Sequence, residues 1–222
     1  MTTDAQPTEI RTPAKAWQEM VRGNLRFIEG APRHPRQDVE RRAEVAIAQN
    51  PHAALFGCSD SRLAAEIIFD KGIGDLFVVR NAGQIISDSV VGSLEYAVGV
   101  LGVPLIVVLG HDKCGAVLAA IDSQGPDAAP LPPHIAGLIS KIVPAVRRVA
   151  NLAGQPGPGA LEPATIDSQL VGREHLRDTI AELLEVSELI SDAVAAGTLA
   201  IVGANYRLLE GRAVADIAIG EL

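Results

Sequence analysis

Residues 104–115 read Pro-Leu-Ile-Val-Val-Leu-Gly-His-Asp-Lys-Cys-Gly, an unbroken apolar run that passes directly into a polar turn. The run is rich in Val, Ile and Leu and lacks strict alternation, which is typical of a parallel strand covered on both faces. Runs of the same character lie at residues 53–56, 75–79 and 199–202, with helical segments between them. This alternation predicts an α/β fold, doubly wound around a mostly parallel central sheet.

We expect the strand order 2-1-3-4 in this sheet, with helices on both faces. Residues 205–209 and 213–219 flank Glu210-Gly211, which predicts a closing hairpin that adds an antiparallel edge strand. Helices are expected from periodicity at residues 64–69, 87–101, 116–121, 135–149 and 166–196.

The length of 222 residues is common for one α/β domain, so we expect a single domain over residues 1–222. Residues 1–50 form an N-terminal helical arm in this interpretation, and residues 51–222 form the core. The first helix of the arm starts near Pro13, and a charged helix follows from about Gln37 to Gln49. The first helix carries an apolar stripe of Trp17, Val21, Leu25 and Ile28. That stripe packs on its own core or covers a second subunit.

Charge and hydropathy restrict the partners and the location of the protein. The formal net charge is −8, so no broad basic surface for nucleic acid or an anionic membrane is expected. No apolar run approaches the roughly 20 residues that a membrane-spanning helix requires. Residues 1–11 are polar and lack the apolar core of a secretion signal. We therefore expect a cytoplasmic protein that acts on a small molecule.

The chain has two cysteines, Cys58 and Cys114, and each follows a predicted strand. Disulfides are rare in a reducing compartment, so metal binding is the better explanation for both. Strands one and three are neighbours in the expected order, which brings Cys58, His111 and Cys114 to one edge of the sheet. Two thiolates and one imidazole are a ligand set for catalytic zinc.

A carboxylate lies beside the first cysteine and offers two arrangements of the site. Three protein ligands leave one zinc position for water, whose pKa the ion lowers. Asp60 can occupy that position itself, or it can pair with Arg62 through two parallel hydrogen bonds and leave the position free. The sequence leaves both arrangements open.

We expect structural roles for Asp112 and for the histidines outside these motifs. Asp112 is expected to be a solvated loop residue. The other four histidines are expected to be surface or packing residues, namely His34, His52, His134 and His175.

The segments Cys58–Arg62 and Gly110–Gly115 together resemble the motifs of the β-class carbonic anhydrases. The resemblance covers nearly the whole chain and includes residues 77–83, 95–98 and 203–211. It implies a zinc lyase that reversibly hydrates carbon dioxide to bicarbonate and a proton by means of zinc-bound hydroxide. One zinc per subunit is implied. No glutamine stands within Phe69–Gly72, which resembles the branch of the family in which aspartate can ligate zinc.

The resemblance also assigns roles to individual residues. It implies that Cys58, His111 and Cys114 are the zinc ligands, with Asp60 as a further possible ligand. Asp60 and Arg62 match the catalytic Asp/Arg pair of the family, in which the aspartate accepts a hydrogen bond from the hydroxide.

By analogy with the family, Leu63, Tyr96 and Val100 line the carbon dioxide pocket. The backbone N–H of Gly115 faces the substrate oxygen in the same analogy. The family's N-terminal arms embrace a neighbouring subunit, which implies a homodimer or a homotetramer.

Two other functions are compatible with the same motifs. Relatives on this scaffold hydrolyse COS or CS2, and a low-turnover zinc-bound sensor of carbon dioxide or bicarbonate is the alternative outside catalysis. Some members of the branch also bind inhibitory bicarbonate through a Trp, an Arg and a Tyr. Arg80 and Tyr206 match that set, but Leu55 stands where the Trp would be, which argues against bicarbonate inhibition.

Overall fold

The computed structural model describes residues 12–154, 157, 159 and 161–222, and over these residues the chain forms a sheet of five strands. The strand order is β2-β1-β3-β4-β5, parallel except for β5, which confirms the predicted topology and its antiparallel edge. The strands are β1 (Ala53–Cys58), β2 (Leu76–Asn81), β3 (Leu105–His111), β4 (Ala200–Arg207) and β5 (Arg212–Ile219).

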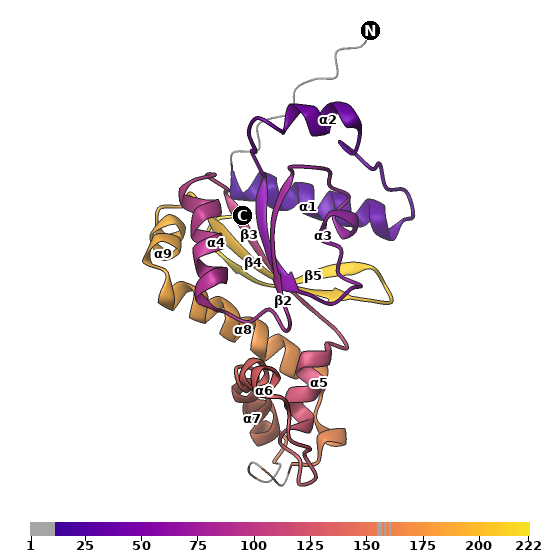
Figure 1. The fold of residues 1–222 in the computed structure, drawn as a ribbon, viewed down its shortest axis with the longest axis vertical. Helices are drawn as coiled ribbons and strands as arrows, with labels where there is room; N and C mark the ends of the chain where they lie inside the picture. Colours follow the sequence, from indigo (N-terminus) through magenta and orange to yellow (C-terminus); the bar gives the residue numbers. More distant parts are fainter. Residues whose placement is uncertain (1–11, 155–156, 158, 160) are drawn as a thin grey trace.

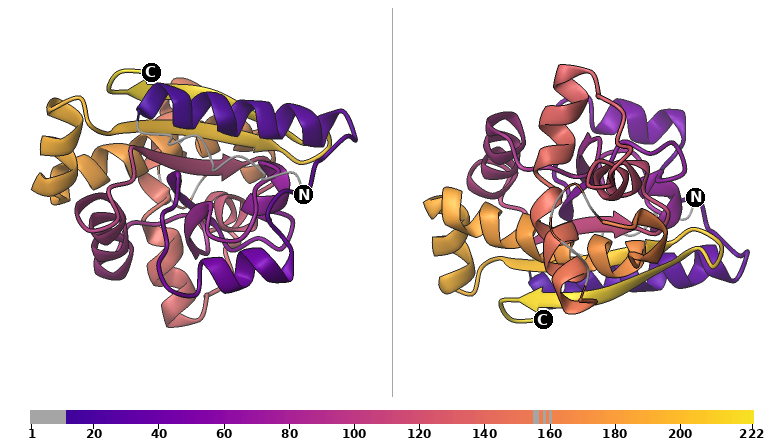
Figure 2. Two further views of the ribbon diagram at one scale, coloured as in Figure 1. Left: turned by 90° about the horizontal axis from the view of Figure 1, so that it is seen from above. Right: turned by 90° about the horizontal axis from the view of Figure 1, so that it is seen from below.

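Helices cover both faces of the sheet, as Figures 1 and 2 show. Side chains alternate between two cores, so that Leu55 packs in one core and Phe56 in the other. The first core includes residues of α1 (Pro13–Ile28) and α3 (Ala65–Ile68). The second includes residues of α4 (Asp88–Gly99), α8 (Ser168–Val186) and α9 (Glu188–Ala195).

Three more helices lie beyond the carboxyl ends of the parallel strands, in the lower part of Figure 1. They are α5 (Gly115–Asp122), α6 (Pro133–Ser140) and α7 (Val143–Leu152), and a short 3-10 helix spans Pro163–Thr165. At the opposite end of the sheet lies α2 (Val39–Glu44) in the arm. No helix within the described residues is long and apolar enough to cross a membrane.

The longer predicted helices are interrupted in the structure. The helix expected at residues 135–149 ends at Ser140 and restarts at Val143, because Pro144 lacks the N–H and its ring would clash with the preceding turn. The helix expected at residues 166–196 breaks at Ser187, whose hydroxyl accepts a hydrogen bond from the N–H of Ile190 at 3.3 Å and so starts α9. The helix α2 is also shorter than the one expected from Gln37 to Gln49.

The last parallel strand runs further than predicted. We expected one strand to end at Gly203 and a separate strand to begin near residue 205, but β4 passes through Gly203 with a bulge at that point. A Cβ at Gly203 would stand 2.6 Å from Cδ1 of Ile180. Glycine is therefore required here for close packing of α8 on the sheet rather than for chain termination.

The helix α1 packs on the sheet mainly through residues outside the predicted apolar stripe, although Trp17 of that stripe is partly buried against the first core. Its buried residues are Pro13, Ala16, Met20, Gly23 and Asn24, whereas Val21 and Leu25 are 37% and 39% exposed. Asn24 anchors the helix, because its amide donates to the carbonyls of Ile68 at 3.1 Å and Gly211 at 2.8 Å. Figure 2 shows α1 lying along the hairpin formed by β4 and β5.

Candidate metal centre

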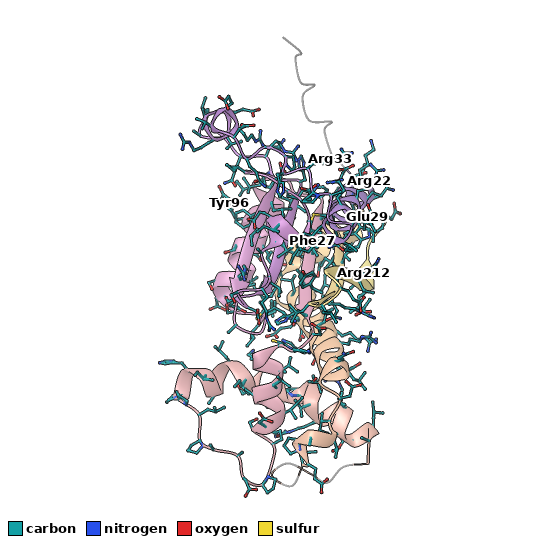
Figure 3. The ribbon with its side chains drawn as sticks, turned by 90° about the vertical axis from the view of Figure 1, so that its right-hand side faces the viewer. Arg22, Phe27, Glu29, Arg33, Tyr96 and Arg212 are labelled. Atoms are coloured by element: carbon teal, nitrogen blue, oxygen red, sulfur yellow. The ribbon has the colours of Figure 1, made fainter. Side chains whose placement is uncertain are left out.

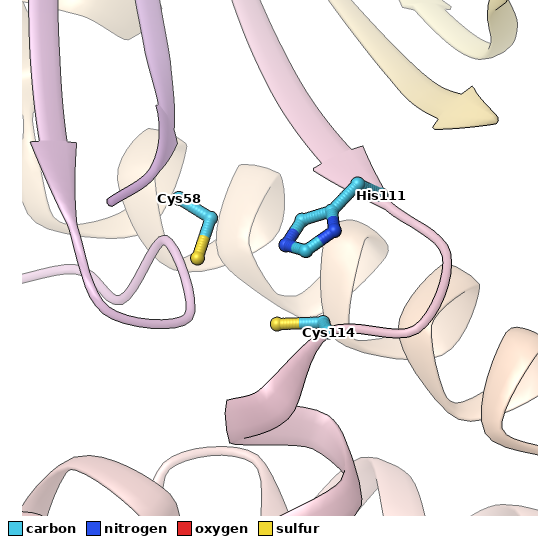
Figure 4. Close-up of side chains that lie close together, drawn as sticks. All are labelled: Cys58, His111 and Cys114. Carbon is cyan, nitrogen blue, oxygen red and sulfur yellow. The ribbon is translucent and has the colours of Figure 1, made fainter. Parts of the chain in front are cut away.

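Three potential ligands converge at the carboxyl edge of the sheet (Figure 4). Cys58 is the last residue of β1, His111 is the last residue of β3, and Cys114 is the N-cap of α5. One donor atom from each lies within 4.8 Å of the others, and all three residues are buried. The convergence that the strand order predicted is therefore confirmed.

The imidazole of His111 is oriented for metal binding. Its Nδ1 lies 2.9 Å from the carbonyl oxygen of Asp112, so Nδ1 carries the proton and donates it there. Its Nε2 is buried and finds no hydrogen-bond partner among the residues that the structure describes. A buried nitrogen lone pair without a partner is unfavourable in a folded protein, and a metal ion at this position would satisfy it.

The two cysteines are free and lie buried beside each other. The Cys114 thiol lowers the pKa of Cys58 by donating to its sulfur, and His111 and the N–H of Gly83 act in the same direction. The pKa of Cys114 is raised, because its thiol donates a hydrogen bond to Cys58 and is buried, so that its deprotonation would place a second anionic sulfur beside the first. A divalent cation removes this conflict, and the N-terminus of α5 favours a thiolate at Cys114. The residues present therefore fit zinc.

The carboxylate of Asp60 is paired with Arg62 in the structure. Arg62 donates from Nε to Oδ1 at 2.8 Å and from Nη2 to Oδ2 at 2.7 Å, and its backbone N–H also donates to Oδ1. These hydrogen bonds from Arg62 hold the pKa of Asp60 far below its ordinary value. Arg62 also reaches the carbonyl of Lys113 at 3.4 Å, so it connects the two motifs.

Two residues beside the site support it in ways that the sequence did not reveal. Arg80, from the end of β2, donates to the carbonyls of Cys58 at 2.9 Å and Asp60 at 2.6 Å. The backbone N–H of Gly83 donates to Sγ of Cys58 at 3.4 Å. The position of Gly83 just after β2, at the same sheet edge, was a usable signal, whereas a guanidinium turned toward a neighbouring backbone has no sequence signature.

The structure corrects the expectation for Asp112 and selects the packing alternative for His175. Asp112 is not merely solvated, because its Oδ1 accepts a hydrogen bond from the N–H of Leu208 at 3.0 Å and so fastens β3 to the loop after β4. His175 is a buried residue whose Nε2 lies 2.7 Å from the carbonyl oxygen of Gly83. The charged sequence around His175 left its burial open, because only one side of α8 faces the interior.

The expected substrate residues fall into two groups in the structure. Leu63 is buried in the same core cluster as Cys58, and Gly115 is the first residue of α5, next to Cys114. Tyr96, in the last turn of α4, is 44% exposed, and Val100, the C-cap of that helix, is 66% exposed.

The position of Tyr96 follows from its aromatic neighbour. The ring of Tyr96 lies 6.1 Å from that of Phe77, which pairs with Ala54 near the amino end of the sheet. Figure 3 places Tyr96 in the upper half of the molecule, above the helices that border the metal centre. Within one chain, therefore, the structure does not bring Tyr96 to Cys58.

The fold and the site together define a class of protein: a parallel α/β metalloprotein with two thiolates and one imidazole at the carboxyl edge of its sheet. A sequence model described as carbonic anhydrase matches residues 53–213. The chain belongs to the carbonic anhydrase family, and within it to the β class.

Relatives with known names resemble most of the chain. Carbonic anhydrase 2 of Mycobacterium tuberculosis is 45% identical over 210 residues, which cover 95% of this chain and 96% of that protein. The carbonic anhydrase of Mycolicibacterium smegmatis is 44% identical, with the same coverage. Among solved structures, the Coccomyxa β-carbonic anhydrase in complex with acetazolamide superimposes with a TM-score of 0.64 at 26% identity, covering 80% of this chain and 78% of that one.

A tetrameric β-carbonic anhydrase from Sordaria macrospora has the same fold, with a TM-score of 0.66 at 24% identity and coverage of 81% of this chain and 87% of that one. The activity and cofactor implied by the motif resemblance are confirmed: the protein is a zinc enzyme that reversibly hydrates carbon dioxide.

Proposed function

We propose that Cys58, His111 and Cys114 hold the zinc ion of this carbonic anhydrase and that Asp60 and Arg62 are its catalytic pair. The observation that carries the proposal is the buried, unpartnered Nε2 of His111, on a ring that has a nitrogen within 4.8 Å of both cysteine sulfurs. Zinc bound there supplies a Lewis acid that lowers the pKa of a coordinated water.

Asp60 then acts as a hydrogen-bond acceptor. Its pairing with Arg62 keeps the carboxylate ionised, and an ionised carboxylate accepts hydrogen bonds but does not donate them. Asp60 can therefore accept a hydrogen bond from the attacking oxygen and so direct a lone pair of that oxygen at carbon dioxide. If the pair with Arg62 breaks, the same carboxylate is free to become a fourth ligand and close the site.

The substrate pocket is proposed to combine residues from more than one subunit. Leu63 and Gly115 lie beside the ligands of their own chain, whereas Tyr96 and Val100 contribute only if they reach the site of a neighbour. Their exposure supports a homo-oligomer, either a dimer or a tetramer, as do Val21 and Leu25 on α1. Sedimentation equilibrium measures the number of subunits.

We also propose a cytoplasmic location and a single domain over residues 1–222. Two free thiols as metal ligands suit a reducing compartment, which supports the location. The polar N-terminal segment on which the sequence argument relied lies outside the described residues. The assignment to one domain stays a prediction.

The test is stopped-flow hydration of carbon dioxide by zinc-loaded protein, comparing wild type with Asp60→Asn and Arg62→Ala. We expect each variant to lose about 100-fold or more in kcat/KM, the usual contribution of a positioned proton acceptor. Asp192→Asn is the control, because it removes an exposed carboxylate on α9. Zinc content, measured in parallel, shows that the loss arises from the pair and not from lost metal.

Wild-type activity no higher than that of the two variants would contradict the catalytic pair. Assays with COS and CS2 on the same preparations address the alternative hydrolase. A low-turnover sensor would bind bicarbonate without measurable hydration.

We expect the hydration activity to rise above neutral pH, because two thiolates make the zinc-bound water a weaker acid than three imidazoles do.

A further inference from the structure

The turn between β2 and α4 passes directly beside the metal centre. Its residue Gly83 is buried, and its N–H donates to Sγ of Cys58 at 3.4 Å. Asn81 braces the same turn, because its side chain accepts from the N–H of Ile85 at 2.8 Å and donates to the carbonyl of Ile85 at 2.7 Å. The turn therefore supplies Cys58 with a hydrogen-bond donor that does not come from a side chain.

The direction of this N–H is not set by Gly83 itself. Gly83 has a φ of +81°, in the left-handed region, and glycine has the widest conformational freedom of all residues. A Cβ at this position would stand 3.0 Å from Cβ of Ala116 and 3.2 Å from Cδ1 of Ile142, so the packing excludes a larger residue. Because the backbone of Gly83 has wide conformational freedom, the direction of its N–H depends on the contacts that hold the carbonyl of the next peptide group.

His175 on α8 holds that carbonyl. Its Nε2 lies 2.7 Å from the oxygen of Gly83, and the residue is 3% exposed. Its Nδ1 is buried and has no hydrogen-bond partner within the described part of the chain. The tautomer with the proton on Nε2 donates to the carbonyl, whereas the other tautomer would set a lone pair against it and bury an unpaired N–H. The geometry thus selects a neutral imidazole that donates from Nε2.

One turn further along α8, Thr179 approaches the next residue of the loop. Its hydroxyl lies 3.4 Å from the carbonyl of Gln84 and 2.9 Å from the carbonyl of His175. The shorter contact is within the helix, so Thr179 is a weaker support for the loop than His175. Burial lowers the pKa of His175, in agreement with a neutral ring.

We propose that His175 is a positioning residue of the metal centre, which acts through the Gly83 peptide groups to aim an N–H at the Cys58 sulfur. This inference rests on the proposed assignment of Cys58 as a zinc ligand. An N–H directed at a metal-bound thiolate takes up part of its negative charge and fixes the direction of the sulfur. His175 touches neither substrate nor metal, and its effect reaches the ligand through one residue of the chain.

The test is zinc affinity, measured by competition with a chromophoric chelator on His175→Phe and His175→Gln. His175→Phe keeps a ring in the space but removes the donor, and we expect zinc binding to weaken by about 10- to 100-fold, the usual effect of losing such a partner. His175→Gln can place an amide N–H near the position of Nε2, and we expect it to recover most of the affinity. Leu183→Ala is the control for stability, because Leu183 is buried on the same helix and belongs to the core on the other face of the sheet.

A second readout is the thiolate-to-metal charge-transfer absorption of cobalt-substituted protein. We expect this band to shift in His175→Phe, to return toward the wild-type position in His175→Gln, and to stay unchanged in Leu183→Ala. Equal zinc affinity in His175→Phe and wild type would overturn the inference while leaving the ligand assignment intact. Equal losses in His175→Phe and Leu183→Ala, or in His175→Phe and His175→Gln, would also overturn it. Failure of the wild type to bind zinc would instead overturn the ligand assignment itself.

Discussion

The carboxylate of Asp75 is fully buried between the N-terminal arm and the core. Arg36 of the arm donates to it from Nε at 2.8 Å, and the N–H of Gly72 donates at 2.7 Å. His52 lies beside it, with Nε2 at 3.6 Å from Oδ1. Burial alone would raise the pKa of Asp75, but His52, Arg36 and Gly72 outweigh burial and lower the pKa. This single residue therefore connects three segments.

We predict that Asp75→Asn lowers the free energy of unfolding at pH 7 by about 3 kcal/mol, because it leaves the Arg36 guanidinium without its buried counter-charge. Urea unfolding of wild type and variant measures the difference. Asp192→Asn, which changes an exposed carboxylate, is the matched control and is expected to stay within about 0.5 kcal/mol of wild type.

The stabilisation by the Asp75–Arg36 ion pair should fall at acidic pH. The pKa of Asp75 in the folded protein lies below its unfolded value of about 4, so the stabilisation is present above that pH and is lost as the pH falls further. The stability gap between wild type and Asp75→Asn should therefore narrow below about pH 4. A gap that is the same at pH 7 and at acidic pH would show that ionisation of Asp75 does not stabilise the fold.

Among the elements, the helix α1 packs closely on the core because Gly23 has no side chain. A Cβ at Gly23 would stand 1.8 Å from the carbonyl oxygen of Phe69, so backbone meets backbone where α1 crosses the end of α3. This contact lets Asn24, the next residue, reach the carbonyl of Ile68. The close approach explains why the buried face of α1 contains Gly23 and Asn24 and not the apolar stripe of Val21 and Leu25.

Two glycines in helices should respond to alanine with opposite signs. Gly23→Ala is expected to destabilise the protein by about 2 kcal/mol, because overpacking at a close contact outweighs the better helix propensity of alanine. Gly92→Ala on α4 is the matched control. Within the described structure a Cβ at Gly92 meets no atom within 4 Å, so we expect a gain of up to about 1 kcal/mol there.

Denaturant unfolding of the two variants measures both effects. Gly23→Ala as stable as Gly92→Ala would mean that α1 can move away from Phe69 without loss. The α1 contacts would then be less specific than the hydrogen bonds of Asn24 indicate.

For the whole molecule, the metal centre joins parts that are far apart in the sequence. The proposed ligands come from the end of β1, the end of β3 and the start of α5. Since an ion bound to all three stabilises only the folded state, zinc binding should contribute directly to the stability of the protein.

We predict that zinc at about 1,000 times its dissociation constant raises the melting temperature by about 10 °C over the chelator-treated protein. Differential scanning fluorimetry measures the shift, and Cys58→Ser should abolish most of it. Magnesium is the control ion, because it prefers oxygen ligands and should have no effect at the same concentration. A shift that persists in Cys58→Ser would place the stabilising zinc elsewhere in the chain.

Much of this arrangement follows from local sequence. The apolar runs predicted the four parallel strands, and the residues that follow them predicted where Cys58, His111 and Cys114 would meet. This succeeded because parallel strands align their carboxyl ends, so residues at strand ends share one edge whatever the helices do. The two-residue spacing of Asp60 and Arg62 also showed that they can pair, but it left open whether Asp60 turns to Arg62 or to the metal.

Other features depend on contacts between distant segments, which no local pattern encodes. The break at Pro144 has a local cause in the sequence, but the passage of β4 through Gly203 depends on the packing of Ile180 from α8. The support that His175 gives to Gly83 spans 92 residues of sequence. The sequence by itself determined the parallel strands, their order and the meeting of Cys58, His111 and Cys114 at one edge of the sheet. Only the tertiary structure decided the pairing of Asp60 with Arg62 and the residues that hold Cys58, because those hydrogen bonds depend on side-chain direction.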